Sequence, residues 1–251
     1  MTTGACETRK PLLEVKGLTM KFGSLAANED IDFDVFPGEI VGLIGPNGAG
    51  KTTCFNCVTG FLQPTAGSVR FLGADITRWA PFDIARLGLV RTFQIVHTFR
   101  DMTVLENVVT SSFVETRSAK DALATADRVI ELTGLGPLRD KLAASLTIAD
   151  KKRLEIARAL ATKPRLVMLD ETMAGLNQTE IREAMDLCLR LKEDGLTLVV
   201  VEHIMEALMP ISDRVVVLDS GRKIMEGTPE EVASDERVIR AYLGDTYNVA
   251  G

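Results

Sequence analysis

The stretch Gly45-Pro46-Asn47-Gly48-Ala49-Gly50-Lys51-Thr52-Thr53 decides the fold class of this chain. It fits the pattern G-x-x-x-x-G-K-[ST] in full, with both bracketing glycines and Lys51-Thr52 at the required spacing. The apolar run Glu39–Ile44 before it predicts a buried strand, and Thr52–Val58 after it contains neither Pro nor Gly and predicts a helix. A strand, a glycine loop and a helix in this order predict a nucleoside-triphosphate site rather than an ordinary Gly-rich turn.

The chemistry of this loop follows from its backbone. Glycines let successive N–H groups point inward at an anion, and the N-terminus of the next helix adds partial positive charge. Lys51 is expected to reach the β- and γ-phosphates, and the Thr52 hydroxyl is expected to ligate Mg²⁺.

Composition limits the remaining classes. The chain has 251 residues, of which 46% are apolar, enough for one large domain or two small ones. Its formal charge of −6 argues against a nucleic-acid partner. No run approaches 18 apolar residues, and residues 1–11 lack the apolar core of a secretory signal. We therefore expect a soluble, cytosolic protein.

The cysteines favour packing over metal binding. Cys54 and Cys57 form a single C-x₂-C without a second pair, and the chain has only 2 histidines, so a zinc site is not expected. Both lie in the predicted helix after the loop, and Cys188 lies on the apolar face of another predicted helix.

Strands and helices alternate along the chain, which predicts an α/β fold with a largely parallel sheet. The expected strands are Leu12–Val15, Ile31–Val35, Leu166–Leu169, Leu196–Val201 and Arg214–Leu218. The expected helices include Thr179–Glu193, one opened by a capping box at Thr228, and Val238–Leu243. Residues 101–162 have helical periodicity, with a capping box at Thr103 and a helix over Lys120–Thr133, and are interpreted as a helical insertion in the α/β core.

Two acids end one of the buried strands. Asp170 is expected to hold the Mg²⁺ shell, partly through water, and Glu171 to deprotonate a water that attacks the γ-phosphate. Such a pair also occurs in ordinary loops, and the phosphate loop is what favours the functional interpretation. His203 ends a neighbouring strand, and Gln94 offers an amide to Mg²⁺ or to the lytic water, although either residue alone is often a surface residue.

The order of these features resembles the ATP-binding-cassette (ABC) ATPases, from about Leu12 to Gly244, with residues 1–11 and 245–251 as tails. The resemblance implies a single P-loop NTPase domain with a RecA-like core, a small antiparallel β subdomain and a helical subdomain. It implies ATP and Mg²⁺ as cofactors. The chain lacks the guanine-reading motif N/T-K-x-D that a GTPase would need, which favours ATP over GTP. It assigns adenine stacking to Phe22, the loop towards a membrane partner to Gln94, and the switch role to His203. It assigns dimer contact to Ala174, Gly175, Leu176 and Asn177.

Several further runs look like the ATP-binding subunits of branched-chain (hydrophobic) amino-acid importers. They are Arg91–Gln94, Thr103–Val108, Arg153–Leu160, Ala174–Asn177 and Val238–Gly244. The resemblance implies integral-membrane permease subunits as partners, a second ABC ATPase subunit, and indirectly a solute-binding protein. It implies a peripheral position on the cytoplasmic face of the inner membrane.

The signature loop departs from the family pattern L-S-G-G-Q. Here it reads Leu146-Thr147-Ile148-Ala149-Asp150. Thr147 keeps a hydroxyl for the phosphate of a partner subunit, Ala149 adds a methyl group where Gly is usual, and Asp150 suits a helix N-cap but brings negative charge. Either the loop is a tolerated variant, or closure of the dimer is weakened or relies on the partner's signature. Thr172 replaces a usual Pro, and Asn177 a usual Asp.

These features predict an ATPase subunit that powers import of a small solute. Two alternatives stay open: a non-transport ABC ATPase, and a low-activity structural cassette in a heterodimer.

Overall fold

The larger sheet carries the phosphate loop. The computed structural model describes residues 9–93 and 97–243. The larger sheet has six strands in the order β10-β9-β3-β8-β7-β6. Their bounds are β3 Ile40–Ile44, β6 Leu89–Arg91, β7 Leu166–Asp170, β8 Thr197–Val201, β9 Arg214–Asp219 and β10 Arg222–Gly227. All neighbours pair in parallel except β10, which pairs antiparallel with β9, so the expectation of a largely parallel α/β sheet is confirmed.

A second, smaller sheet is antiparallel. Its order is β2-β1-β4-β5, with bounds β1 Leu13–Phe22, β2 Leu25–Val35, β4 Ala66–Phe71 and β5 Ala74–Asp75. β1 and β2 extend well beyond the predicted Leu12–Val15 and Ile31–Val35. The additional residues are rich in polar side chains, so hydrophobic periodicity did not mark them.

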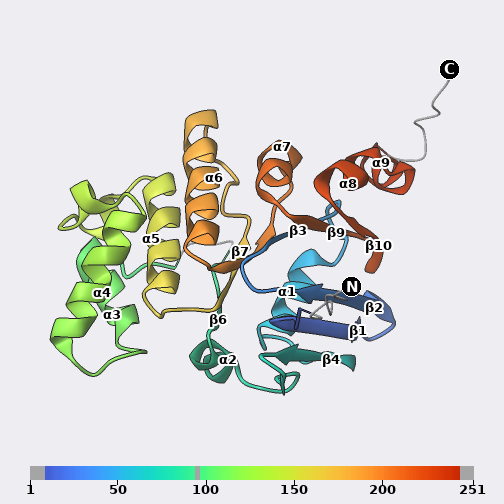
Figure 1. Cartoon of the computed structure of the whole chain (residues 1–251), viewed down its shortest axis with the longest axis horizontal. Coiled ribbons are helices and arrows are strands. Elements are labelled where there is room, and N and C mark those ends of the chain that lie inside the picture. Colours follow the sequence, from blue (N-terminus) through green and yellow to red (C-terminus); the bar gives the residue numbers. More distant parts are fainter. Residues whose placement is uncertain (1–8, 94–96, 244–251) are drawn as a thin grey trace, which may run out of the picture.

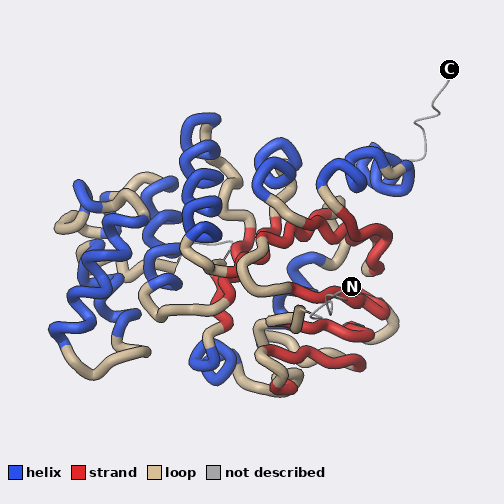
Figure 2. Tube along the Cα trace, in the orientation of Figure 1, coloured by secondary structure: helices blue, strands red, loops and turns tan. Residues whose placement is uncertain are grey.

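The helices cover both faces of the larger sheet. Their bounds are α1 Lys51–Val58, α2 Pro81–Leu87, α3 Val104–Ser112, α4 Ala119–Leu132, α5 Ile148–Leu160, α6 Gln178–Glu193, α7 Met205–Leu208, α8 Pro229–Ser234 and α9 Glu236–Leu243; the 3₁₀ turns are Gly136–Leu138, Ala143–Ser145 and Met209–Ile211. In Figure 1, α6, α7 and α8 lie above the sheet, and α1 lies between it and the smaller sheet. Figure 2 shows the same two sheets as red strands.

Alternate strand residues supply two cores. Ile40 and Ile44 of β3 face the core under α5 and α6, whereas Val41 and Leu43 face the core shared with α1 and the smaller sheet. This alternation follows from the period of two in a strand. It fixes the register of β3 and therefore where the loop after Ile44 emerges.

Residues 101–162 hold α3, α4 and α5, which stand beside the sheets (Figure 1). Thr103 caps α3 through a capping box, as the sequence predicts, and the helix predicted over Lys120–Thr133 is α4. The capping box predicted at Thr228 is confirmed, and the helix predicted over Thr179–Glu193 is α6. Among the described residues, no helix is both long enough and apolar enough to cross a membrane.

Candidate nucleotide site

Two glycines of the phosphate loop are required by close backbone approach. A Cβ on Gly50, whose φ is +96°, would lie 2.4 Å from the Ala27 carbonyl oxygen. A Cβ on Gly45, whose φ is +154°, would lie 2.1 Å from the Leu218 carbonyl oxygen. Both distances are too short for any side chain, so the loop can run between β2 and β9 only with glycine at these positions.

The loop borders a cavity of about 400 Å³. From the phosphate loop and helix α1, the cavity is lined by Asn47, Gly48, Ala49, Gly50, Lys51, Thr52 and Thr53; from other segments, by Leu25, Ala26, Ala27, Glu171, Ser220 and Gly221. Glu171 comes from the end of β7, about 120 residues further along the chain than the loop. The cavity therefore brings the predicted phosphate cradle and the predicted base together at the carboxyl ends of the parallel strands.

Lys51 is held at the base of the loop. Its Nζ donates to the carbonyl oxygens of Gly45 at 2.6 Å and Pro46 at 3.0 Å. Burial lowers the pKa of Lys51, while the negative charges of Glu171 and Asp170 oppose that shift. The ammonium group thus lies in the field of both carboxylates.

Asp170 and Glu171 have different surroundings. Asp170 is 2% exposed, and Arg91 of β6 donates to its Oδ2 at 2.9 Å. Burial raises the pKa of Asp170 although the charge of Arg91 acts in the opposite direction. Glu171 is half-buried and has a φ of +49°, in the left-handed region that non-glycine residues rarely adopt. Such a conformation persists only where neighbouring contacts hold it.

Arg91 was missed as a site residue by the sequence reasoning. Its guanidinium lies 4.7 Å from the ring centroid of Phe55 and 4.8 Å from that of Phe93. The cation therefore exchanges part of its hydration for aromatic faces and for Asp170. The signal available in the sequence was a basic residue at the end of a short apolar run, which is too common to single out.

Asn28 was missed as well. It is fully buried on β2, and its Nδ2 donates to the Gly50 carbonyl oxygen at 3.1 Å. The β9–β10 turn adds a second support, because the Gly221 N–H donates to the Ala49 carbonyl oxygen at 3.1 Å. The phosphate loop is thus supported by two segments distant from it in sequence.

Phe22 and His203, two residues with predicted roles at the nucleotide, do not line the cavity. Phe22 ends β1, is 47% exposed and pairs in register with Leu25, which does line it. His203 is exposed just after β8. Gln94 lies outside the described residues. The roles of all three in adenine stacking, switching and Mg²⁺ binding stay predictions.

The signature loop corrects one expectation. Asp150 is not the N-cap of α5: Thr147 is, and its hydroxyl accepts from the Asp150 N–H at 3.1 Å. The same hydroxyl donates to Asp150 Oδ2 at 2.7 Å, and Arg153 donates to Asp150 Oδ1 at 2.9 Å. Thr147 is the residue that begins the helix because its backbone is extended while residue 148 is already helical.

The three remaining residues of the signature loop differ in their surroundings. Ala149 is buried in the first turn of α5 and is not among the residues with positive φ, so glycine is not needed there for backbone conformation. Leu146 is buried, while Ile148 is 65% exposed and presents an apolar side chain at the surface.

The predicted dimer loop leads into α6. Asn177 is its N-cap, and its Oδ1 accepts from the N–H groups of Thr179 at 2.9 Å and Glu180 at 3.0 Å. Asn and Asp are equally suited to this position, which accounts for Asn in place of the usual Asp. Ala174, Gly175 and Leu176 precede the cap, and nothing in a single chain tests their role in dimer contact.

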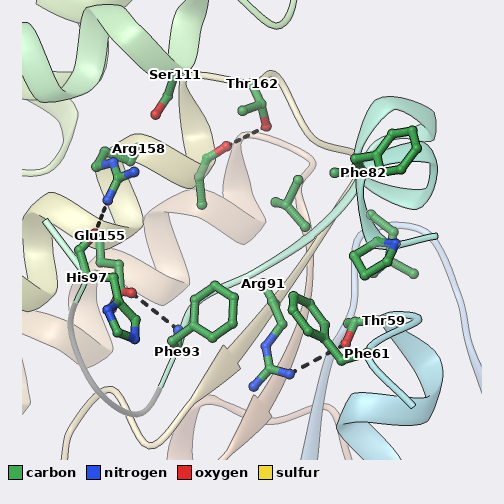
Figure 3. A pocket seen from close by; sticks show the side chains of 15 residues that line it. Thr59, Phe61, Phe82, Arg91, Phe93, His97, Ser111, Glu155, Arg158 and Thr162 are labelled. Atoms are coloured by element: carbon green, nitrogen blue, oxygen red, sulfur yellow. Dashed lines mark hydrogen bonds between the residues drawn. The ribbon is translucent and has the colours of Figure 1, made fainter. Parts of the chain in front are cut away.

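A second cavity, of about 360 Å³, lies between α2 and α5. Figure 3 shows Glu155 and Arg158 at one end of it and Phe82 at the other. Phe61, Phe82 and Phe93 supply aromatic surface, and Glu155 is nearly buried. Burial raises the pKa of Glu155 to about 7, against hydrogen bonds from the backbone of Phe93 and His97. The cavity is thus a largely apolar groove that also holds one buried acid and the side chains of Arg91 and Arg158.

The family assignment comes from the whole chain. Residues 28–174 match the family model described as ABC transporter, which covers more than half of the chain. The chain belongs to the ABC transporter family. As a member of that family it is an ATP-binding cassette and an ATPase with the P-loop NTPase fold, as the sequence predicts.

Relatives of this ABC cassette extend over nearly its full length. It is 42% identical to the high-affinity branched-chain amino acid transport ATP-binding protein LivG of Escherichia coli K12, and 40% identical to BraF of Pseudomonas aeruginosa, which has the same description; each alignment covers 94% of this chain and 99% of the relative. The crystal structure of the ADP conformation of an ATP-binding cassette of an ABC transporter superposes with a TM-score of 0.85 at 30% identity, covering 94% of this chain and 100% of that one. Residues 222–248 match a second family model, branched-chain amino acid ATP-binding cassette transporter.

Proposed function

We propose that this cassette hydrolyses ATP to power the import of branched-chain or related hydrophobic amino acids. The observation that carries the amino-acid part is the match of residues 222–248 to the branched-chain cassette model, in addition to the general ABC match. A cassette does not need to contact the transported solute, so its relatives are the best guide to substrate class. The full-length similarity to LivG supports the same proposal.

Hydrolysis is assigned to the cavity at the phosphate loop. Its backbone N–H groups and Lys51 bind the phosphates, and Glu171 accepts a proton from the attacking water. The presence of Glu171 on the wall of the same cavity as the loop supports this role. ATP binding stabilises a closed pair of cassettes, and loss of the γ-phosphate removes that stabilisation.

Mg²⁺ fits this site through few protein ligands. In the described part of the chain, no group of three or more His, Cys, Asp or Glu side chains is placed to hold an ion. Mg²⁺ typically retains water and binds phosphate oxygens with one or two protein groups, which suits Thr52 on the cavity wall and Asp170 acting through water. Bound there, Mg²⁺ would neutralise charge on the phosphates. Gln94 completes the proposed set.

The groove between α2 and α5 is proposed to take a segment of an integral-membrane permease. Its aromatic side chains favour a helix with apolar residues, and the buried Glu155 favours a donor group on that helix. We place the cassette on the cytoplasmic face of the inner membrane, where the permease would hold it.

A second cassette is proposed to complete the nucleotide site. Its signature loop, Leu146–Asp150, would face the triphosphate across the dimer, and Ala174–Asn177 would contact the partner. A periplasmic solute-binding protein would act indirectly, through the permease.

Uptake of radiolabelled leucine by cells tests the proposed function. Deletion of this gene is expected to lower leucine uptake strongly, and the wild-type gene is expected to restore it while the Glu171→Gln gene does not. Uptake of an unrelated sugar serves as the control. Unchanged leucine uptake in the deletion strain would exclude the amino-acid assignment, and restoration by Glu171→Gln would indicate a structural rather than a hydrolytic cassette.

A further inference from the structure

The loop from Glu171 to Ala174 is held from two sides by two charged side chains, the buried Glu202 and the partly buried Lys152, that neither the family pattern nor the sequence reasoning singled out. We propose that Glu202 and Lys152 are positioning residues that hold the catalytic loop and, through it, Glu171. The proposal rests on the proposed function, since it takes Glu171 as the base.

Glu202 anchors the middle of the loop. It is 0% exposed and follows the last residue of β8. Its Oε1 accepts from the Met173 N–H at 2.7 Å, while its Oε2 is buried without a hydrogen-bond partner among the described residues. Burying a carboxylate is unfavourable unless hydrogen bonds or an opposite charge compensate for the lost water. The hydrogen bond that Glu202 accepts comes from the loop.

Lys152 anchors both ends of the loop. It lies in the second turn of α5, and its Nζ donates to the carbonyl oxygens of Glu171 at 3.0 Å and Ala174 at 2.5 Å. Charge-assisted hydrogen bonds are stronger than neutral ones, and two from one ammonium group fix the separation of the two carbonyls. The negative charge of Glu202 also acts on Lys152, so the two side chains attract each other across the loop.

The combined contacts explain how the unfavourable backbone of Glu171 persists. Its N–H donates to the Val201 carbonyl oxygen at 2.9 Å, its carbonyl oxygen accepts from Lys152, and the Met173 N–H is held by Glu202. A residue at a φ of +49° needs such over-determination. Because α5 begins in the signature loop and Ala174 begins the dimer loop, Lys152 also links those two segments to the base.

Steady-state ATP hydrolysis and direct ATP binding test the proposal. Glu202→Ala and Lys152→Met are expected to lower kcat by about 10-fold or more while the Kd for ATP changes less than about threefold, because a small displacement of a catalytic group reduces the rate without removing phosphate contacts. Glu202→Gln keeps an acceptor for the Met173 N–H, and Lys152→Arg keeps a charged donor, so both are expected to retain most of kcat. Lys151→Met, one residue away on α5, is the matched control.

Hydrogen exchange gives a second readout that does not depend on catalysis. The Met173 amide is expected to exchange faster in Glu202→Ala than in Glu202→Gln, with amides of α6 unchanged. Should Glu202→Ala fail to fold, Lys152→Met decides the matter, since Lys152 is only partly buried. Wild-type kcat in Lys152→Met, or equal losses in Lys152→Met and Lys152→Arg, overturns the proposal. Wild-type turnover in Glu171→Gln would instead refute the role of Glu171, while faster Met173 exchange would still support the positioning contact.

Discussion

Arg91 at the end of β6 and Asp170 at the end of β7 form a buried ion pair of 2.9 Å, with side chains only 8% and 2% exposed. The pair lies where two parallel strands reach the nucleotide site, and three aromatic rings surround the cation. The carboxylate proposed to serve Mg²⁺ is therefore oriented by a protein cation that the sequence motif does not include.

Loss of Arg91 is expected to destabilise the protein. Arg91→Leu would leave Asp170 as an unpaired buried charge, which typically lowers the free energy of unfolding by about 3–5 kcal/mol. Urea denaturation of the variant, compared with Arg78→Leu at an exposed arginine, measures the effect. Equal stability of the two variants would show that Asp170 finds another partner.

Replacement of the two charged groups at the cavity is expected to separate binding from chemistry. Glu171→Gln should keep ATP affinity and slow hydrolysis by about 10²-fold, the usual scale for loss of a general base. Lys51→Ala should instead weaken ATP binding, since it removes a phosphate contact. Isothermal titration with ATP and a phosphate-release assay report the two quantities, with Glu193→Gln at an exposed acid as control. Wild-type turnover in Glu171→Gln would remove it from the role of base.

Stacking on adenine is assigned to Phe22 only by the family resemblance. Phe22→Ala is expected to weaken ATP binding by about 1–3 kcal/mol, the range for aromatic–base stacking. Phe113 is the matched control because it is exposed to the same extent, 47%, and lies beyond α3. If the two alanine variants bind ATP equally well, adenine does not rest on Phe22.

The signature loop is expected to behave as a tolerated variant. Because Thr147 and Arg153 already bind the Asp150 carboxylate, Asp150→Gln should leave ATP-driven dimerisation unchanged in a Glu171→Gln background. It should lower stability by about 0.3–1 kcal/mol, since an acid in the first turn of a helix interacts favourably with the helix dipole. Size-exclusion chromatography with ATP checks the dimer. Stronger dimerisation, most marked at low salt, would support the alternative that this charge opposes closure.

Glu155 is expected to make stability depend on pH. Burial raises its pKa to about 7 in the folded state, whereas the pKa of Glu in an unfolded chain is about 4.3. The folded state therefore holds the proton more tightly, so the stabilisation is present below about pH 4 and is lost as the pH rises towards about 7. In the wild type, the free energy of unfolding should fall by about 1–3 kcal/mol between these limits because of Glu155. In Glu155→Gln this decrease should be absent. Urea unfolding across the range measures it, and Glu115→Gln, at an exposed acid, should leave the slope unchanged.

The sequence by itself determined the nucleotide class, the α/β architecture and the strand that delivers Asp170 and Glu171. Each of these is local: nine contiguous residues make up the predicted phosphate cradle, and runs of apolar residues bounded by turns predict strands and helices. Capping boxes at Thr103 and Thr228 were readable for the same reason, since every contact spans three residues.

Only the tertiary structure decided which side chains support that site. Arg91 pairs with Asp170 from 79 residues away, Asn28 supports Gly50 from 22, and Lys152 reaches Glu171 from 19. A lone Arg, Asn or Lys in the sequence carries no mark of such a contact, because it arises from the packing of separate strands and helices around a shared core. The direction of the Asp150 carboxylate likewise depends on where α5 begins, and the extended backbone of Thr147 rather than the motif settles that position.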